Sequence, residues 1–150
     1  MRRAARAIVI HDDKLLVMHR NKFGTEYLTL PGGNVEMGKT PEQAMYRELD
    51  EETMVTVADP RLVIIEHAGD PYGDQYIFSC KYIEGEPQLK PGSEEELINK
   101  LGQNLYTPKW VALAELKDIA FVSEELKQTI ITHSDQGFPK EPITLYWRKV

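Results

Sequence analysis

Short runs of aliphatic and β-branched residues, separated by polar turns, make up most of this chain, and such runs predict strands. We predict strands over residues 4–10, 14–19, 27–30, 62–67, 75–83, 110–113 and 143–147. Asp12 and Asp13 lie between the first two runs, which therefore form a hairpin. Residues 21–26 and the turn-rich segment 69–74 are predicted as polar loops.

A helical spacing of apolar residues begins at Thr40 and continues to about Thr53. Thr40 suits the N-cap and Pro41 suits the first helical position. Gln43 completes a Thr-x-x-Gln capping box, in which each end of the motif satisfies a backbone N–H group of the other. We therefore predict the start of this helix more sharply than its end.

Two further helices follow. The first covers residues 93–101, with Ser93 and Glu96 as a second capping box. The second covers residues 123–132 and is amphipathic, so that it buries one apolar stripe. Strands mixed with helices in this order predict a layered α/β domain.

The composition is that of an ordinary globular protein. The 150 residues are 41% hydrophobic and 28% charged, which suits one domain over residues 1–150 and argues against disorder. The net charge of -6 argues against nucleic acid and anionic membranes as partners. A single cysteine, Cys80, excludes a disulfide framework and a multi-cysteine zinc site. We find neither a signal-peptide core nor a run of about 20 apolar residues, so we expect a cytoplasmic protein.

The segment from residue 30 to residue 55 carries the candidate chemistry. On its helix, Glu48, Glu51 and Glu52 are spaced i, i+3, i+4 and therefore share one face. Like charges at this spacing repel one another. Mg²⁺ relieves that repulsion because it binds carboxylate oxygens together with substrate phosphate oxygens. A solvated acidic face is the alternative interpretation for this triplet on its own.

The same segment resembles the Nudix box of the Nudix hydrolase family. That pattern is a Gly, five residues, a Glu, seven residues, and then Arg-Glu-apolar-x-Glu-Glu-x-Gly-apolar. The residues in register with it are Gly33, Arg47, Glu48, Leu49, Glu51, Glu52 and Val55. Leu30, Pro31, Gly32 and Glu36 are also similar to the family. The resemblance implies a Nudix-type α/β/α sandwich with a mixed β-sheet between helices.

Two positions depart from the family pattern. Lys39 stands in place of the first Glu, which in the family pairs with the box Arg, and it cannot pair with Arg47. Glu36 and Glu51 are the candidates to replace that partner. Met54 stands in place of the Gly that closes the helix in a left-handed conformation. Since a non-Gly residue there costs roughly 1–2 kcal/mol, we expect this helix to end differently.

Lys39 also creates a competing motif, because residues 33–40 match the P-loop pattern G-x-x-x-x-G-K-[ST] of a phosphotransferase. We reject it, since Glu36 would put a carboxylate on a loop that should attract phosphate. The strand before it is short and interrupted by Pro31. A P-loop also leaves the register of the helix carboxylates unexplained.

The resemblance implies hydrolysis of the diphosphate linkage of a nucleoside diphosphate derivative, by attack of water on phosphorus with Mg²⁺, for which Mn²⁺ can substitute. A small-molecule nucleotide is then the partner, and a homodimer is left open. The metal ligands that the resemblance implies are Glu48, Glu51, Glu52 and the carbonyl of Gly32. The implied catalytic residues are Glu48, Glu52 and Arg47. The implied substrate contacts are Arg20, Gly33 and Tyr72.

The general base and the exact substrate stay open. The base is a glutamate of the box or one of Glu94, Glu95 and Glu96, which otherwise only complement a helix dipole. Some subfamilies of the Nudix family have a Pro or a Tyr in the segment after the box. The resemblance therefore implies ADP-ribose through Pro71 and dinucleoside polyphosphates through Tyr72, and it leaves nucleotide sugars and nucleoside triphosphates open as well. The alternative function is a degenerate Nudix module that binds a nucleotide without hydrolysing it.

Overall fold

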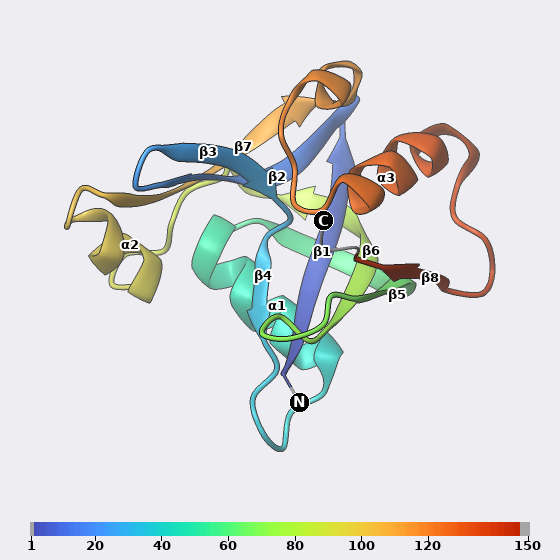
Figure 1. Ribbon diagram of the computed structural model, residues 1–150, viewed down its shortest axis with the longest axis horizontal. Coiled ribbons are helices and arrows are strands. Elements are labelled where there is room, and N and C mark those ends of the chain that lie inside the picture. The colour runs from blue at the N-terminus through green and yellow to red at the C-terminus, as the bar shows by residue number, and fades with distance from the viewer. Residues whose placement is uncertain (1, 148–150) are drawn as a thin grey trace.

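The computed structural model describes residues 2–147, and its helices lie on both sides of a central sheet (Figure 1). The strands are β1 (Arg3–His11), β2 (Lys14–Lys22), β3 (Thr25–Thr29), β4 (Gly32–Asn34), β5 (Thr56–His67), β6 (Asp74–Glu84), β7 (Asn104–Ala112) and β8 (Ile143–Tyr146). The helices are α1 (Pro41–Thr53), α2 (Glu94–Asn99), the 3-10 helix η1 (Leu113–Asp118) and α3 (Glu124–Gln136). None of the helices described has the length and apolar character needed to cross a membrane.

The sheet is mixed, as predicted. Its strands follow the order β3-β2-β1-β6-β5-β8, with β4 paired to β1 and β7 paired to β2. β1 runs parallel to β6 and β5 runs parallel to β8, whereas the other pairs are antiparallel. The central strands β1 and β6 therefore have neighbours on both sides, and their residues are buried on both faces.

Alternation along β1 divides the core into two layers. Ala5, Ala7 and Val9 belong to the apolar cluster that α1 covers, whereas Ile8 belongs to the cluster that α3 and η1 cover. Because successive side chains of a strand point to opposite faces, one strand serves both layers. The expected α/β/α sandwich is confirmed.

The N-terminal hairpin has the predicted turn but longer strands. Asp12 and Asp13 have positive φ angles of 52° and 59°, which suits a two-residue hairpin turn. β2 continues to Lys22 and β3 begins at Thr25, so the predicted loop 21–26 was too long. β7 pairs with β2 along its whole length, and this long-range pairing extends the strands beyond what local sequence signals indicate.

Other elements of the structure also differ from the predicted ones in their bounds. β4 and η1 were not predicted, β7 begins earlier than residue 110, and α3 continues past residue 132. α2 is shorter than residues 93–101, and the Glu96 side chain accepts a hydrogen bond from the backbone of Gly92 instead of completing a box with Ser93. The earlier start of β7 follows from its pairing with β2, whereas the change at Glu96 is a local capping contact.

The start of α1 is as predicted, but its end is not. Thr40 and Gln43 form both hydrogen bonds of the capping box. Met54 adopts the left-handed conformation, with φ 56° and ψ 21°, and its N–H group donates to the carbonyl of Asp50. The expectation that α1 would end differently was therefore wrong. Met54 takes the conformation that glycine favours, and Gln88 Nε2 lies 3.4 Å from its Sδ atom.

Candidate active site

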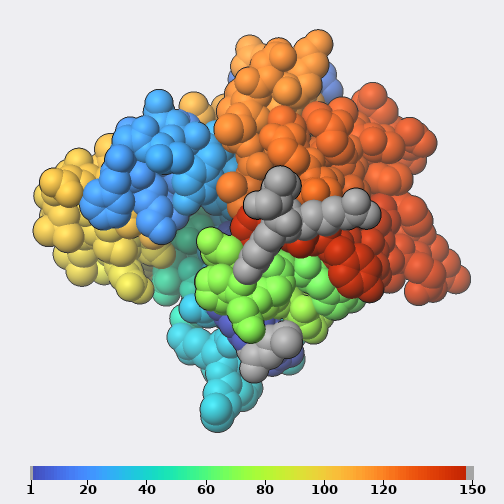
Figure 2. Space-filling view, in the orientation of Figure 1, coloured from blue at the N-terminus to red at the C-terminus, as the bar shows by residue number. Residues whose placement is uncertain are grey.

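A pocket of about 590 Å³ opens at one end of the sheet, between α1, α2 and the start of α3. Figure 2 shows α2 and the β2–β3 hairpin on one side of the molecule and η1 with α3 on the other. The predicted site residues that line the pocket are Arg20, Gly32, Gly33, Arg47, Glu48, Glu51, Glu52, Tyr72, Glu94 and Glu95. Lys39, Pro71 and Glu96 are not among the lining residues. The position of Lys39 outside this pocket is a further reason to reject the P-loop, in which that lysine would contact phosphate.

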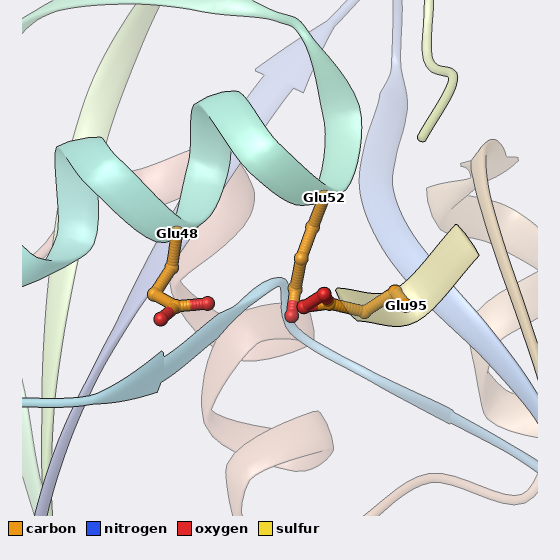
Figure 3. Close-up of side chains that lie close together, drawn as sticks. All are labelled: Glu48, Glu52 and Glu95. Carbon is orange, nitrogen blue, oxygen red and sulfur yellow. The ribbon is translucent and has the colours of Figure 1, made fainter. Parts of the chain in front are cut away.

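Three carboxylates meet inside this pocket. One oxygen from each of Glu48, Glu52 and Glu95 lies within 4.8 Å of the others. Figure 3 shows Glu48 and Glu52 descending from α1 and Glu95 approaching them from the start of α2. Glu51, which was grouped with the first two from the sequence, lines the pocket but is not part of this cluster. We call Glu48, Glu52 and Glu95 the acidic cluster.

Two consecutive glycines let β4 pass close under the acidic cluster. The backbone N–H group of Gly32 donates to Glu52 Oε1 at 3.0 Å. A Cβ atom on Gly33 would lie 2.6 Å from Cδ of Glu48, which is too close for any side chain. A larger residue at Gly33 would push Glu48 away, whereas one at Gly32 would clash with the backbone of β1, because its Cβ atom would lie 2.2 Å from the carbonyl oxygen of Ala5.

Burial opposes ionisation of the acidic cluster. It raises the pKa of Glu48 to about 7, despite the opposing attraction of Arg47. It raises the pKa of Glu52 to about 8, although the hydrogen bond from Gly32 and the charge of Arg6 act the other way. Burial also raises the pKa of Glu95, and each member repels at least one of the others.

One oxygen of the acidic cluster has no internal partner. Glu95 is 8% exposed, and its Oε2 atom is the one buried side-chain oxygen without a hydrogen bond among residues 2–147. Buried polar atoms are nearly always hydrogen-bonded, so an orphaned carboxylate oxygen needs an explanation. A hard divalent cation held by the acidic cluster would neutralise its repulsion, so the carboxylates fit Mg²⁺ or Mn²⁺. The unpaired Oε2 atom of Glu95 is then available to accept a hydrogen bond or a proton from water.

Arg47 holds the loop before α1 against the acidic cluster. Its Nη1 atom lies 2.6 Å from Glu36, and its Nη2 atom lies 2.8 Å from Glu48. Nη2 also donates to the carbonyl of Asn34 at 3.2 Å. Glu36 therefore takes the place of the partner that Lys39 cannot supply, while Glu51 does not.

Arg20 and Tyr72 lie at different walls of the pocket. Arg20 lies over the ring of Tyr106, 3.7 Å from its centroid, and donates to the carbonyl of Leu105 at 3.3 Å. Tyr72 lies beside Trp147, with ring centroids 4.9 Å apart. Both sequence-predicted side chains are thus held at the pocket surface by neighbours from distant segments.

Four charged residues that line the pocket were missed; Arg2 precedes β1 and Lys22 ends β2, whereas Arg6 and Glu66 lie within strands. Arg6 and Glu66 line it from β1 and β5. A signal existed for each, because each interrupts a strand whose neighbouring residues are aliphatic. A charge within such a run is seldom buried without a partner or a purpose.

The comparisons with known proteins all identify the same family. The family model of the NUDIX domain matches residues 1–130. The chain is 37% identical over 81 residues to the 8-oxo-dGTP diphosphatase of Escherichia coli (strain K12), a match that covers 51% of this chain and 61% of that protein. It is 45% identical over 56 residues to the RNA pyrophosphohydrolase of Mannheimia succiniciproducens, covering 37% of this chain and 28% of that protein.

The similarity extends to solved structures. The crystal structure of a NUDIX hydrolase from Nitrosomonas europaea superposes with a TM-score of 0.72 at 20% identity, covering 99% of this chain and 79% of that one. At this identity the match bears on the fold alone. The matches to both named relatives span less than two-thirds of those proteins, 61% and 28% of their lengths.

Proposed function

Because this chain belongs to the Nudix hydrolase family, we propose that it hydrolyses the diphosphate linkage of a nucleoside diphosphate derivative. Two relatives are named for cleavage of 8-oxo-dGTP and of a pyrophosphate on RNA. With a net charge of -6, a long polyanion is the poorer substrate for this chain. We therefore propose a mononucleotide derivative as substrate, and residues 1–150 as one domain.

The single observation that supports hydrolysis most is the orphaned oxygen of Glu95 inside the acidic cluster. Glu48 and Glu52 would hold Mg²⁺ or Mn²⁺ on the α1 side, and the carbonyl of Gly32 would add a neutral ligand. When bound, such an ion polarises the diphosphate and neutralises the charge that develops on it.

Residues of this chain supply the remaining chemistry. Glu95 Oε2 is the proposed general base, because its raised pKa and its lack of a partner suit acceptance of a proton from the attacking water. Arg47 is a positioning residue, since its contacts are to Glu48, Glu36 and the loop backbone. Arg20, Gly33 and Tyr72 are proposed to contact the substrate, as they line the same pocket.

No observation favours the alternative of binding without hydrolysis. Lys39 and Met54 were the reasons to consider it. Glu36 makes the ion pair with Arg47 that Lys39 cannot make, and Met54 adopts the left-handed conformation that Gly favours. Both departures therefore leave the carboxylates of α1 in position.

A substrate panel tests the proposal. Purified protein with millimolar Mg²⁺ or Mn²⁺ is incubated with ADP-ribose, nucleotide sugars, dinucleoside polyphosphates and nucleoside triphosphates. Products are identified as nucleoside monophosphate, inorganic pyrophosphate or phosphate. Turnover of at least one diphosphate that stops on addition of EDTA supports hydrolysis, whereas no turnover of any substrate with either metal contradicts it.

We expect the metal-free protein to become less stable as the pH rises. Glu48 and Glu52 have pKa values of about 7 and about 8 in the folded state against 4.5 as the ordinary value. The folded state therefore binds more protons than the unfolded state between these values, and the free energy of unfolding falls across this range.

Thermal melts in EDTA and in Mg²⁺, at about pH 5.5 and about pH 8.5, measure this effect. Metal at about 100 times its dissociation constant should add about 2.7 kcal/mol, and should add most at the higher pH, where the ligands ionise. Identical melting temperatures with and without metal at the higher pH would count against a metal site at the acidic cluster.

A further inference from the structure

Three polar side chains form a row along the pocket, which starts at Arg6 beside the acidic cluster and ends at Glu66. Arg6, Gln75 and Glu66 come from the neighbouring strands β1, β6 and β5, and all line the pocket. Arg6 Nε donates to Gln75 Oε1 at 2.9 Å, and Gln75 Nε2 donates to the carbonyl of Tyr72 at 2.9 Å. All three side chains therefore combine hydrogen bonds to their neighbours with a surface that lines the pocket.

Glu66 is buried, 5% exposed, and its carboxylate is oriented by one residue. Ser123 Oγ caps α3 by accepting from the backbone N–H group of Leu126 at 3.1 Å, so its single hydrogen is directed to Glu66 Oε2. Within residues 2–147 this is the one hydrogen bond that the Glu66 carboxylate receives. The remaining acceptor positions are directed to the pocket that Glu66 lines.

The walls around Glu66 suit a flat ring. Tyr72 and Trp147 form an aromatic pair at 4.9 Å, and Val122 and Leu126 add apolar surface at the start of α3. Flat heteroaromatic rings stack well on aromatic side chains. Apolar walls beside a few placed polar groups are the usual design for recognition of a ring by its hydrogen-bonding edge.

Charge divides the pocket into two ends. A carboxylate at Glu66 repels phosphate, so the diphosphate belongs with the acidic cluster, its cation, and basic residues such as Arg20 and Lys22. The ring of Tyr106 is not open for stacking on that side, because the guanidinium of Arg20 covers it at 3.7 Å. Arg6 interacts electrostatically with both Glu52 and Glu66 and therefore lies between the two ends.

We propose that Glu66 determines specificity for a guanine base, which it recognises by accepting hydrogen bonds from the ring N–H group and the neighbouring exocyclic amino group. This inference rests on the proposal that the substrate is a nucleotide. Adenine and cytosine offer a ring acceptor beside their amino group, and uracil flanks its N–H group with two carbonyls. Each of these edges places a lone pair against the carboxylate, whereas guanine offers two adjacent donors.

Binding without metal tests this proposal independently of hydrolysis. The fluorescence of Trp147 is recorded in a Trp110→Phe background, in EDTA, during titration with GMP, IMP, AMP, CMP and UMP. GMP should bind about tenfold or more tightly than IMP, which lacks the amino group, because a hydrogen bond to a charged group is worth about that much. AMP, CMP and UMP should bind more weakly still.

Glu66→Gln should lower GMP affinity by about tenfold or more and leave AMP affinity unchanged or higher. Ser123 would hold the oxygen of the introduced amide, which turns its N–H₂ group toward the donors of guanine. The matched control is Glu125→Gln, which removes a charge that acts on Glu66 but does not line the pocket. It should bind GMP as the parent does.

Base selectivity of the parent needs no variant at Glu66 and is measured even if that variant fails to fold. Equal affinity for all five nucleotides, or unchanged GMP affinity in a folded Glu66→Gln protein, overturns the proposal. If hydrolysis of every diphosphate fails while GMP selectivity is found, the proposal for the base stands and the proposed hydrolysis does not.

Discussion

Glu52→Gln should reduce kcat/KM by at least about a hundredfold on whichever diphosphate is cleaved, because one strong charge-stabilising contact is worth about 3 kcal/mol in the transition state. The substitution keeps the size of the side chain and removes the charge. The amide oxygen of the variant could still accept the hydrogen bond that Gly32 now gives to Glu52 Oε1, so the backbone of β4 should stay in place. Steady-state rates at saturating Mg²⁺ measure the effect, and melting in EDTA checks that the variant is folded.

Lys39→Glu is the informative contrast to Glu52→Gln. Lys39 does not line the pocket, and Glu36 already pairs with Arg47, so we expect this substitution to leave activity within about threefold. On a P-loop interpretation the order reverses, because Lys39 would then hold the transferred phosphate. An inactive Lys39→Glu protein beside an active Glu52→Gln protein would overturn the assignment of the acidic cluster.

Glu95→Gln should also cost at least about a hundredfold in kcat, since it removes the proposed general base while the α1 carboxylates remain. The same substitution should raise the melting temperature in EDTA. It removes a buried charge that raises the pKa of both Glu48 and Glu52. Opposite changes in activity and stability are the expected signature of a functional carboxylate that has no structural partner.

Glu94→Gln and Glu96→Gln are the matched controls, because they remove neighbouring charges of the same helix start. Glu94 lines the pocket but does not belong to the acidic cluster, and Glu96 only accepts a hydrogen bond from Gly92. Both should retain activity within about threefold of the parent. A Glu96→Gln protein that loses more activity than Glu95→Gln would move the general base away from the acidic cluster.

Features that depend on local spacing could be predicted from the amino-acid sequence. The capping box at Thr40 defined the start of α1, and helical periodicity put Glu48 and Glu52 on one face of it. The Gly32-Gly33 pair indicated a close approach of the backbone, and a close approach is what Gly33 and Glu48 make. The Nudix box predicted the family and the sandwich fold, because all residues of its pattern lie within one continuous segment of the sequence.

The tertiary structure alone decided which distant side chains complete the site. It selected Glu95 from three consecutive glutamates, because only the orientation of α2 against α1 determines which of them reaches the acidic cluster. It excluded Glu51 from that cluster although helical spacing had grouped it with the others. It chose Glu36 as the partner of Arg47, which depends on the path of the loop between them.

The same dependence on tertiary structure explains why Arg6 and Glu66 were missed and why the end of α1 at Met54 was predicted wrongly. Whether a charge in a strand is exposed or faces a pocket depends on which element covers that face of the sheet. Here the start of α3 borders the pocket, and its N-cap Ser123 donates a hydrogen bond to Glu66. Met54 adopts the left-handed conformation in spite of a conformational cost of roughly 1–2 kcal/mol. Local preferences amount to tenths of a kcal/mol to about 1 kcal/mol per residue, whereas burial of one large side chain contributes about 1.5–3 kcal/mol. Packing therefore decides wherever the two disagree.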